Sequence, residues 1–231
     1  MLKVVRLRQD IGQRLFVGLL GHYTAERKER MNDSPRPRRL IIGISGASGV
    51  IYGIRLLEIL QPLPDVKTHL VVSSAAAQTI GLETDYSMEQ VNALANVTYR
   101  FKDIAAAIAS GSFRTSGMIV APCSMKTLAG IANSYSDNLL LRAADVVLKD
   151  RRRLVLLPRE TPLHLGHLRL MTLAVEMGAI MAPPLPAFYH RPQSLDDIVN
   201  QTVNRVLDLL DIELPQDLFD RWQGGKSARD N

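Results

Sequence analysis

The sequence predicts a doubly wound parallel sheet of the α/β class, with helices on both faces in a three-layer sandwich. Two observations lead to this prediction. Short aliphatic runs alternate along the chain with longer segments in which apolar residues recur at helical spacing. The aliphatic runs contain few polar residues, which is typical of parallel strands buried on both faces. Ligands of such folds bind beyond the carboxyl ends of the strands, so the residues that follow each strand are the candidate site.

Strands are predicted where β-branched and aliphatic residues follow one another without a polar face. Pro122 is expected to end the third strand, because proline donates no hydrogen bond to a ladder. The predicted strands are residues 38–45, 67–73, 116–122, 153–158 and 178–183.

Helices are predicted where apolar residues recur every three or four positions. The last helix is expected to run from Ser194 to about Leu210, and Ser194 with Asp197 three residues later resembles a capping arrangement. The earlier helical segments are residues 50–60, 74–82, 88–95, 103–111, 124–132, 138–149 and 167–178.

The chain of 231 residues is long enough for one α/β domain. We expect a basic N-terminal arm at 1–38, the domain at 39–224 and a flexible tail at 225–231. The arm ends in the proline-rich stretch SPRPRR. It is expected to be either disordered or an extension upstream of a translation start at Met31.

The net charge of +5 is concentrated near the N-terminus, since residues 1–39 hold ten Lys and Arg against four Asp and Glu. The rest of the chain is close to neutral, which argues against a broad nucleic-acid-binding surface. No run of about 18 apolar residues occurs, so no membrane span is expected. Cys123 is the only cysteine, which excludes an intramolecular disulfide and indicates a cytoplasmic protein. It is interpreted as a small buried residue, because no base is placed beside it.

The glycine-rich segment GISGASG, residues 43–49, lies between a predicted strand and a predicted helix. In that position backbone N–H groups and a helix start can bind a phosphate, with Ser45 or Ser48 as a further donor. A Rossmann dinucleotide site also needs an acidic residue at the end of the second strand, where this chain has Ser73 and Ser74. A mononucleotide is therefore favoured, and the alternative is a tight turn without a ligand.

Polar residues also follow the next two strands. Ser124, Lys126 and Thr127 open a helix, and a helix start of this kind suits an anion. Arg159 and Glu160 end the strand after it. A cation beside a carboxylate suits phosphate binding with proton transfer, and the alternative is an ion pair that caps the sheet.

Further polar residues on two predicted helices and after the last predicted strand are candidates for the same chemistry. Arg142, Asp145 and Lys149 share one face of a predicted helix, which alone would indicate a solvated charged stripe. Tyr189 follows the last predicted strand and offers a hydroxyl donor and an aromatic wall. Arg205 on the final helix is either its cationic partner or a surface residue.

His164 and His167 stand three residues apart and could suggest a metal pair. They have neither the glutamate of an HExxH motif nor an evident third ligand. No metal site is therefore expected.

Six blocks of the sequence together resemble the UbiX family of flavin prenyltransferases over roughly residues 39–224. The blocks are GISGASG, LETD (82–85), PCS (122–124), LRAADVVLK, LPRETPLHLGHLRLM and PAFYHRPQSLDD. The resemblance implies a flavodoxin-like or Rossmann-like fold and a homododecamer with sites where subunits meet. It also implies a metal-independent reaction of dimethylallyl monophosphate with N5 and C6 of reduced FMN. The product, prenylated FMN, would serve a UbiD-type decarboxylase in ubiquinone biosynthesis.

The resemblance also assigns roles to individual residues. Glu83 corresponds to a carboxylate that handles the proton at flavin N5, Glu160 to one that assists the departing phosphate, and Ser48 to a third catalytic residue. The FMN-binding residues it implies are Gly46, Ala47, Ser48, Ser73, Ser124, Met125, Lys126, Thr127 and Arg159. The prenyl-phosphate-binding residues it implies are Arg142, Lys149, Arg159, Tyr189 and Arg205.

Two positions depart from the family pattern: Ser74 stands where relatives usually carry lysine, and Arg153 where they usually carry proline. Two other functions stay open. An FMN-dependent decarboxylase of a cysteine-derived substrate would leave the phosphate-binding residues without a purpose. A non-catalytic FMN-binding subunit would not need both Glu83 and Glu160.

Overall fold

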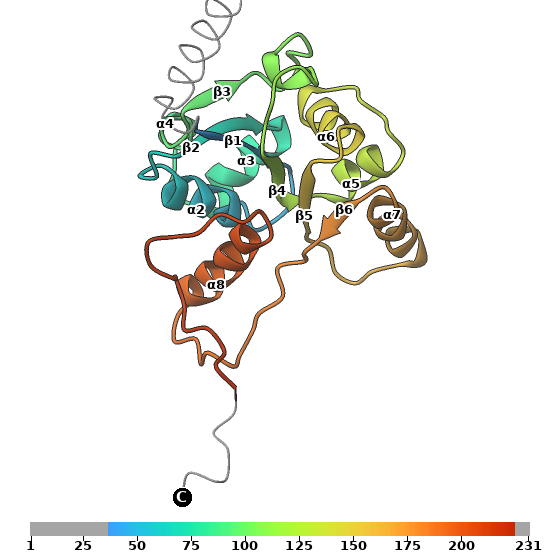
Figure 1. Cartoon of the computed structure of the whole chain (residues 1–231). Helices are drawn as coiled ribbons and strands as arrows, with labels where there is room; N and C mark the ends of the chain where they lie inside the picture. The colour runs from blue at the N-terminus through green and yellow to red at the C-terminus, as the bar shows by residue number, and fades with distance from the viewer. Residues whose placement is uncertain (1–36, 225–231) are drawn as a thin grey trace, which may run out of the picture. The chain divides into compact units, whose positions relative to one another are not determined.

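The computed structural model describes residues 37–224, which form a six-stranded sheet with strand order β3-β2-β1-β4-β5-β6 (Figure 1). Neighbouring strands are parallel throughout. The expected tail at 225–231 and all but the last two residues of the expected arm lie outside the described residues, as does Met31. The strands are β1 (Arg38–Ile44), β2 (Val66–Val72), β3 (Val97–Tyr99), β4 (Gly117–Cys123), β5 (Arg153–Pro158) and β6 (Ala179–Met181).

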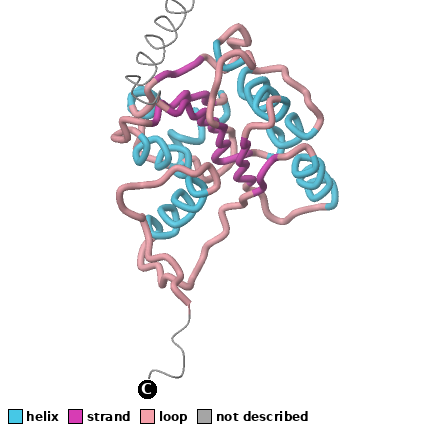
Figure 2. Tube along the Cα trace, viewed as in Figure 1, coloured by secondary structure: helices cyan, strands magenta, loops and turns pink. Residues whose placement is uncertain are grey.

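Helices cover both faces of this sheet (Figures 1 and 2). They are α2 (Ile51–Leu60), α3 (Ser74–Glu83), α4 (Met88–Ala93), α5 (Met125–Ala132), α6 (Leu139–Lys149), α7 (Leu165–Glu176) and α8 (Leu195–Asp208). One apolar cluster contains buried side chains of α2, α3, α4 and α8, and a second contains those of α5, α6 and α7. None of these helices has the length and apolar run needed to cross a membrane.

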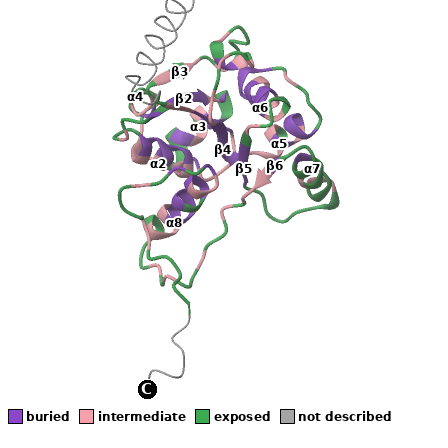
Figure 3. Cartoon of the chain, viewed as in Figure 1, coloured by how far each residue is buried: buried purple, intermediate pink, exposed green. Residues whose placement is uncertain are grey.

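Strand β1 shows why the fold is doubly wound. Leu40, Ile42 and Ile44 belong to the cluster with α8, whereas Ile41 belongs to the cluster with α6. All four side chains are almost completely buried, and the central strands β4 and β5 are buried along most of their length, whereas the edge strands β3 and β6 are only partly buried (Figure 3). Successive side chains of a strand point to opposite faces, so an aliphatic run of this kind needs helices on both. The predicted fold class is confirmed.

The predicted start of the last helix is confirmed in detail, and the helix ends at Asp208, two residues before the predicted end. The Ser194 hydroxyl accepts a hydrogen bond from the Asp197 N–H at 3.2 Å, and the Asp197 carboxylate accepts one from the Ser194 N–H at 2.9 Å. This reciprocal pair is a capping box, which satisfies backbone donors that a helix start leaves free.

The prediction of a helix over residues 103–111 was wrong. The segment forms turns and a single 3₁₀ turn at Ala107–Ala109, and Ile108 is its one buried residue. A short helix gains most of its stability from packing an apolar face, which this segment does not have. Strand β3 was not predicted, because it has three residues and pairs with β2 at the edge of the sheet.

The prediction that Pro122 ends the third strand was wrong. Strand β4 continues through it to Cys123, and its register against β5 shifts between Val120 and Cys123. The missing N–H of proline therefore falls where the ladder is already interrupted. The Pro122 carbonyl accepts a hydrogen bond from the Ser45 N–H at 3.2 Å, which ties the end of β4 to the loop after β1.

Candidate active site

The site lies where the order of strands in the sheet reverses. Strands β1 and β4 are neighbours in the sheet, but their following helices cover opposite faces. Such a switch point leaves a crevice beyond the carboxyl ends of the two strands, where ligands of this fold class bind. The loops that follow β1 and β4 carry the glycine-rich segment and Ser124, respectively.

Ser45 joins these two loops. Its hydroxyl donates a hydrogen bond to the Pro122 carbonyl at 3.0 Å and accepts one from the Ser124 N–H at 2.8 Å. The side chain is fully buried, so it is not available as a donor to a ligand. Of the two serines considered from the sequence, the structure leaves Ser48 for that role.

A first cavity, the helix-start cavity, has a volume of about 540 Å³ and lies between the starts of α3 and α5. Each helix start is capped by a serine: Ser73 accepts from the Ala76 N–H at 3.1 Å, and Ser124 accepts from the Thr127 N–H at 3.3 Å. Two helix starts on one cavity favour a bound anion. The cavity brings together most of the predicted flavin-binding residues: Gly46, Ser73, Ser124, Met125, Lys126 and Thr127, with Glu160 beside them.

A second cavity, the carboxylate cavity, has a volume of about 600 Å³ and contains Ser48, Glu83 and Arg159. The Glu83 carboxylate accepts a hydrogen bond from the Gly49 N–H at 2.8 Å. Gly49 has a φ of +94°, a left-handed conformation that glycine adopts without strain. Helices α2 and α8 contribute an apolar part of the wall, and Thr84, Asp85 and Asp196 are further polar residues of the lining. The apolar part is Ile51, Tyr52, Leu195, Ile198 and Val199.

Arg159 and Glu160 connect the two cavities. They are consecutive residues at the end of β5, yet Arg159 lines the carboxylate cavity and Glu160 lines the helix-start cavity. Among residues 37–224 no ion pair joins them, so the alternative of an ion pair capping the sheet is not what the structure contains. The Glu160 carboxylate instead accepts from the Thr161 N–H at 3.0 Å.

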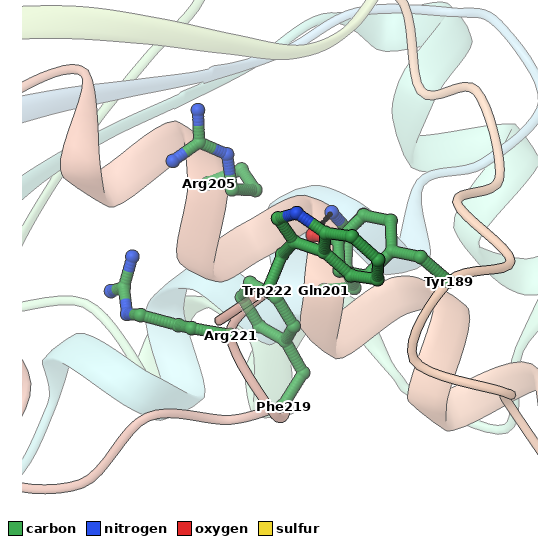
Figure 4. Close-up of a pocket in the computed structure, with 6 residues that line it drawn as sticks. All are labelled: Tyr189, Gln201, Arg205, Phe219, Arg221 and Trp222. Carbon is green, nitrogen blue, oxygen red and sulfur yellow. Dashed lines mark hydrogen bonds between the residues drawn. The ribbon is translucent and has the colours of Figure 1, made fainter. Parts of the chain in front are cut away.

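A third cavity, the aromatic cavity, has a volume of about 620 Å³ and contains Tyr189 and Arg205 (Figure 4). Tyr189 lies in the loop that follows β6, and Arg205 lies on α8. The Gln201 amide lies 3.4 Å from the Tyr189 hydroxyl, as the dashed line shows. The two residues expected to share a phosphate are thus together.

The two remaining cations of the predicted phosphate site lie elsewhere. Arg142 forms an ion pair with Asp145 at 2.7 Å, and Lys149 forms one with Asp150 at 3.3 Å. Both cations are on α6, which packs against the opposite face of the sheet from α8. A single chain therefore does not bring Lys149 to Arg205.

Cys123 and the histidine pair do not take part in these cavities. Cys123 is buried, as expected, and burial raises the pKa of its thiol to about 12. His164 stacks on His167 with ring centroids 3.6 Å apart, and its Nδ1 accepts from the Gly166 N–H. Between residues 37 and 224 no three His, Cys, Asp or Glu side chains are grouped as metal ligands.

Known proteins similar to this chain are flavoproteins and flavin prenyltransferases. The Flavoprotein family matches residues 28–207. Flavin prenyltransferase UbiX of Escherichia coli (strain K12) is 68% identical over 187 residues, which are 81% of this chain and 99% of that protein. The chain belongs to the UbiX family of flavin prenyltransferases.

Two solved structures of UbiX-like proteins have the same fold. The dodecameric FMN-dependent UbiX-like decarboxylase from Escherichia coli O157:H7 matches with a TM-score of 0.78 and 54% identity, covering 80% of this chain and all of the other. AnUbiX (PadA1) in complex with FMN and dimethylallyl pyrophosphate matches with a TM-score of 0.79 and 49% identity, covering 83% of this chain and all of the other. The sequence-based assignment to the UbiX family is confirmed.

The structure also adds residues to the site that the sequence did not indicate. Phe219, Arg221 and Trp222 follow α8 and line the aromatic cavity with Tyr189 and Arg205. An arginine close to two aromatic residues in the sequence is typical of binding surfaces. This segment is far along the sequence from the other motifs, so the sequence did not indicate that it joins the site.

Gly46 provides a test of the helix-start cavity. A Cβ at this position would lie 2.4 Å from the Ala75 Cβ, so Gly46→Ala must push the loop away from the start of α3. We expect the Kd of this variant for FMN to rise roughly tenfold or more, because overpacking typically costs about 1–3 kcal/mol. Flavin fluorescence titration measures the Kd. Gly81→Ala on the same helix, where a Cβ meets nothing within 4 Å, is the control and should leave the Kd unchanged.

Proposed function

We propose that this chain transfers the dimethylallyl group of dimethylallyl monophosphate to N5 and C6 of reduced FMN, releasing inorganic phosphate and prenylated FMN. The observation that supports this best is the placement of Arg159 and Glu160. Arg159 lines the carboxylate cavity with Glu83, and the adjacent Glu160 lines the helix-start cavity with most of the expected flavin-binding residues. Phosphate binding and proton transfer can therefore act at one place. AnUbiX, which has FMN and dimethylallyl pyrophosphate bound, is similar over 83% of this chain.

The helix-start cavity suits the FMN phosphate. Two serine-capped helix starts, a lysine and a threonine supply donors for an anion, and the loop at Gly46 approaches α3 closely enough to exclude a side chain. Ala47 and Ser48 continue the same loop. Reduced FMN, when bound, supplies the nucleophilic N5 and C6 atoms.

The cations assist departure of the phosphate. When the allylic C–O bond breaks, negative charge grows on the leaving phosphate, and donors held in place lower the free energy of that step. Lys149, Arg159, Tyr189 and Arg205 are the donors in this proposal, with Arg142 supporting them. Glu160 assists the departing phosphate and Glu83 handles the proton at N5, while Ser48 lies beside Glu83.

The carboxylate cavity protects the allyl group from water. Its wall includes the aliphatic or aromatic side chains of Ile51, Tyr52, Leu195, Ile198 and Val199. An apolar, aromatic wall excludes water and favours a developing cation.

The assembly proposed for this chain is a homododecamer, the state of the similar protein from Escherichia coli O157:H7. The split of the phosphate-binding residues supports it. Lys149 and Arg205 lie on opposite faces of the sheet of one chain, so they can share a phosphate when they come from different subunits.

The product is proposed to serve a UbiD-type decarboxylase in ubiquinone biosynthesis, in the cytoplasm. The test mixes the product of an anaerobic reaction with a UbiD-type decarboxylase purified without its cofactor. We expect the complete reaction to activate the decarboxylase, which then releases CO₂ from its substrate. A reaction without the prenyl donor should give no release of CO₂. Equal activity with unmodified FMN would contradict the proposal.

A further inference from the structure

The chain segment after α8 turns back onto that helix. Residues 217–222, here called the C-terminal strap, are anchored where the Leu218 N–H donates to the buried Asn204 side chain at 2.8 Å. The aromatic rings of the strap lie against Tyr189: ring centroids are 6.4 Å apart for Phe219 and 6.1 Å for Trp222. The strap thus forms one wall of the aromatic cavity (Figure 4).

Arg221 clamps this strap to α8. Its two terminal nitrogens each donate to one oxygen of Asp208, both at 2.8 Å, and its Nε donates to Asp217 at 2.5 Å. A bidentate arginine–carboxylate pair is geometrically specific and stronger than a neutral hydrogen bond. The hydrogen bonds from Arg221 lower the pKa of the Asp208 carboxyl and of the Asp217 carboxyl, so both stay ionised.

Asp208 also holds Arg205. Its Oδ2 accepts from Arg205 Nη1 at 2.9 Å while it pairs with Arg221. Among residues 37–224 this is the only side-chain hydrogen bond of Arg205, whose side chain is 53% exposed. The two arginines of the cavity therefore differ: every nitrogen of Arg221 is occupied by a carboxylate, whereas Arg205 keeps donors free to bind an anion.

We propose that Asp208 is a positioning residue, which orients Arg205 toward the prenyl phosphate and, through Arg221, holds the C-terminal strap against Tyr189. The inference rests on the proposed function, because it takes the prenyl phosphate as the anion that Arg205 binds. A donor fixed before the ligand arrives loses little conformational entropy on binding.

The test uses the full-length protein with FMN bound and two variants, Asp208→Asn and Arg221→Gln. Asp208→Asn keeps the size of the side chain and removes its charge, and Arg221→Gln removes the guanidinium that makes the clamp. Asp211→Asn is the matched control, because this exposed carboxylate near the end of the same helix pairs with Arg153 at 2.6 Å and lies outside the aromatic cavity.

The first measurement follows the strap itself. Trp222 is the only tryptophan of the chain, so its fluorescence anisotropy decay reports on the strap without a label. Both variants should add nanosecond local motion of Trp222, while Asp211→Asn should not. Unchanged decays in both variants would overturn the clamp, and this measurement needs no prenyl donor.

The second measurement is the KM for dimethylallyl monophosphate. If Asp208 positions Arg205, both variants should raise KM roughly tenfold, because each weakens a charge-assisted hydrogen bond. The change in kcat should be smaller. If only the local net charge mattered, Asp208→Asn would lower KM and Arg221→Gln would raise it. Opposite shifts, or an unchanged KM in variants whose Trp222 moves, would overturn the proposal.

The two measurements also separate this inference from the proposed function. A wild-type protein that leaves FMN unmodified would contradict the prenyl transfer itself. The Trp222 decays of the variants would still decide whether Asp208 and Arg221 hold the strap.

Discussion

Replacing Glu160 with glutamine is expected to lower kcat by roughly 10²–10⁴-fold, the usual range for loss of a positioned acid or base. Glutamine keeps the shape of the side chain at the edge of the helix-start cavity but cannot carry a proton. FMN should stay bound, because the donors to its phosphate come from other residues of that cavity. Stopped-flow measurement of flavin conversion gives kcat, and flavin fluorescence gives retention.

Glu176→Gln is the control for this variant, since Glu176 is exposed at the end of α7. It should have wild-type kcat and FMN affinity. Full activity of Glu160→Gln would refute the role of this carboxylate. Loss of FMN from the variant would place Glu160 in flavin binding instead.

Lys149→Ala and Arg205→Ala are each expected to raise the KM for the prenyl phosphate roughly tenfold to a hundredfold. Each removes one charged donor to the phosphate, and neither residue lines the helix-start cavity, so FMN affinity should not change. Lys67→Ala is the control, because Lys67 is the exposed second residue of β2. An unchanged KM in Lys149→Ala would exclude that residue from the phosphate site.

Mixing the two variants tests the shared site. When subunits of Lys149→Ala and Arg205→Ala are dissociated and reassembled together at equal amounts, roughly a quarter of the sites should recover both residues if these come from different subunits. Activity at a donor concentration well below the raised KM should rise accordingly. If one chain supplied both residues, no mixture could restore a complete site, so an unchanged activity would contradict the shared site.

The sequence predicted the layers of the fold because burial leaves a clear pattern. Strands such as 40–44 are apolar on both faces, and α8 is marked by its capping box and its helical period. Elements with little buried surface were mispredicted or missed: the 103–111 segment and β3 contain few side chains that pack. The prediction for Pro122 was wrong because the ladder between β4 and β5 is locally irregular there and accommodates the proline. The residue type alone does not indicate such an irregularity.

The loop residues of the site could be predicted, because strand ends of a parallel sheet meet at one edge. Gly46, Ser73 and Ser124 are close together for that reason. The sequence could not show which of Ser45 and Ser48 is available to a ligand. That depends on burial, which leaves the Ser45 hydroxyl hydrogen-bonded to backbone groups of Pro122 and Ser124. The clamp of Asp208 and Arg221 depends on how the chain returns over α8, and no periodicity or motif spacing contains that information.

The prenyl transfer is tested most directly by the mass of the flavin. The protein is incubated anaerobically with reduced FMN and dimethylallyl monophosphate, and the flavin is then extracted and weighed by mass spectrometry. The proposed function predicts a flavin heavier than FMN by one C₅H₈ unit, together with one inorganic phosphate released per flavin converted. A flavin of unchanged mass after full incubation would contradict it.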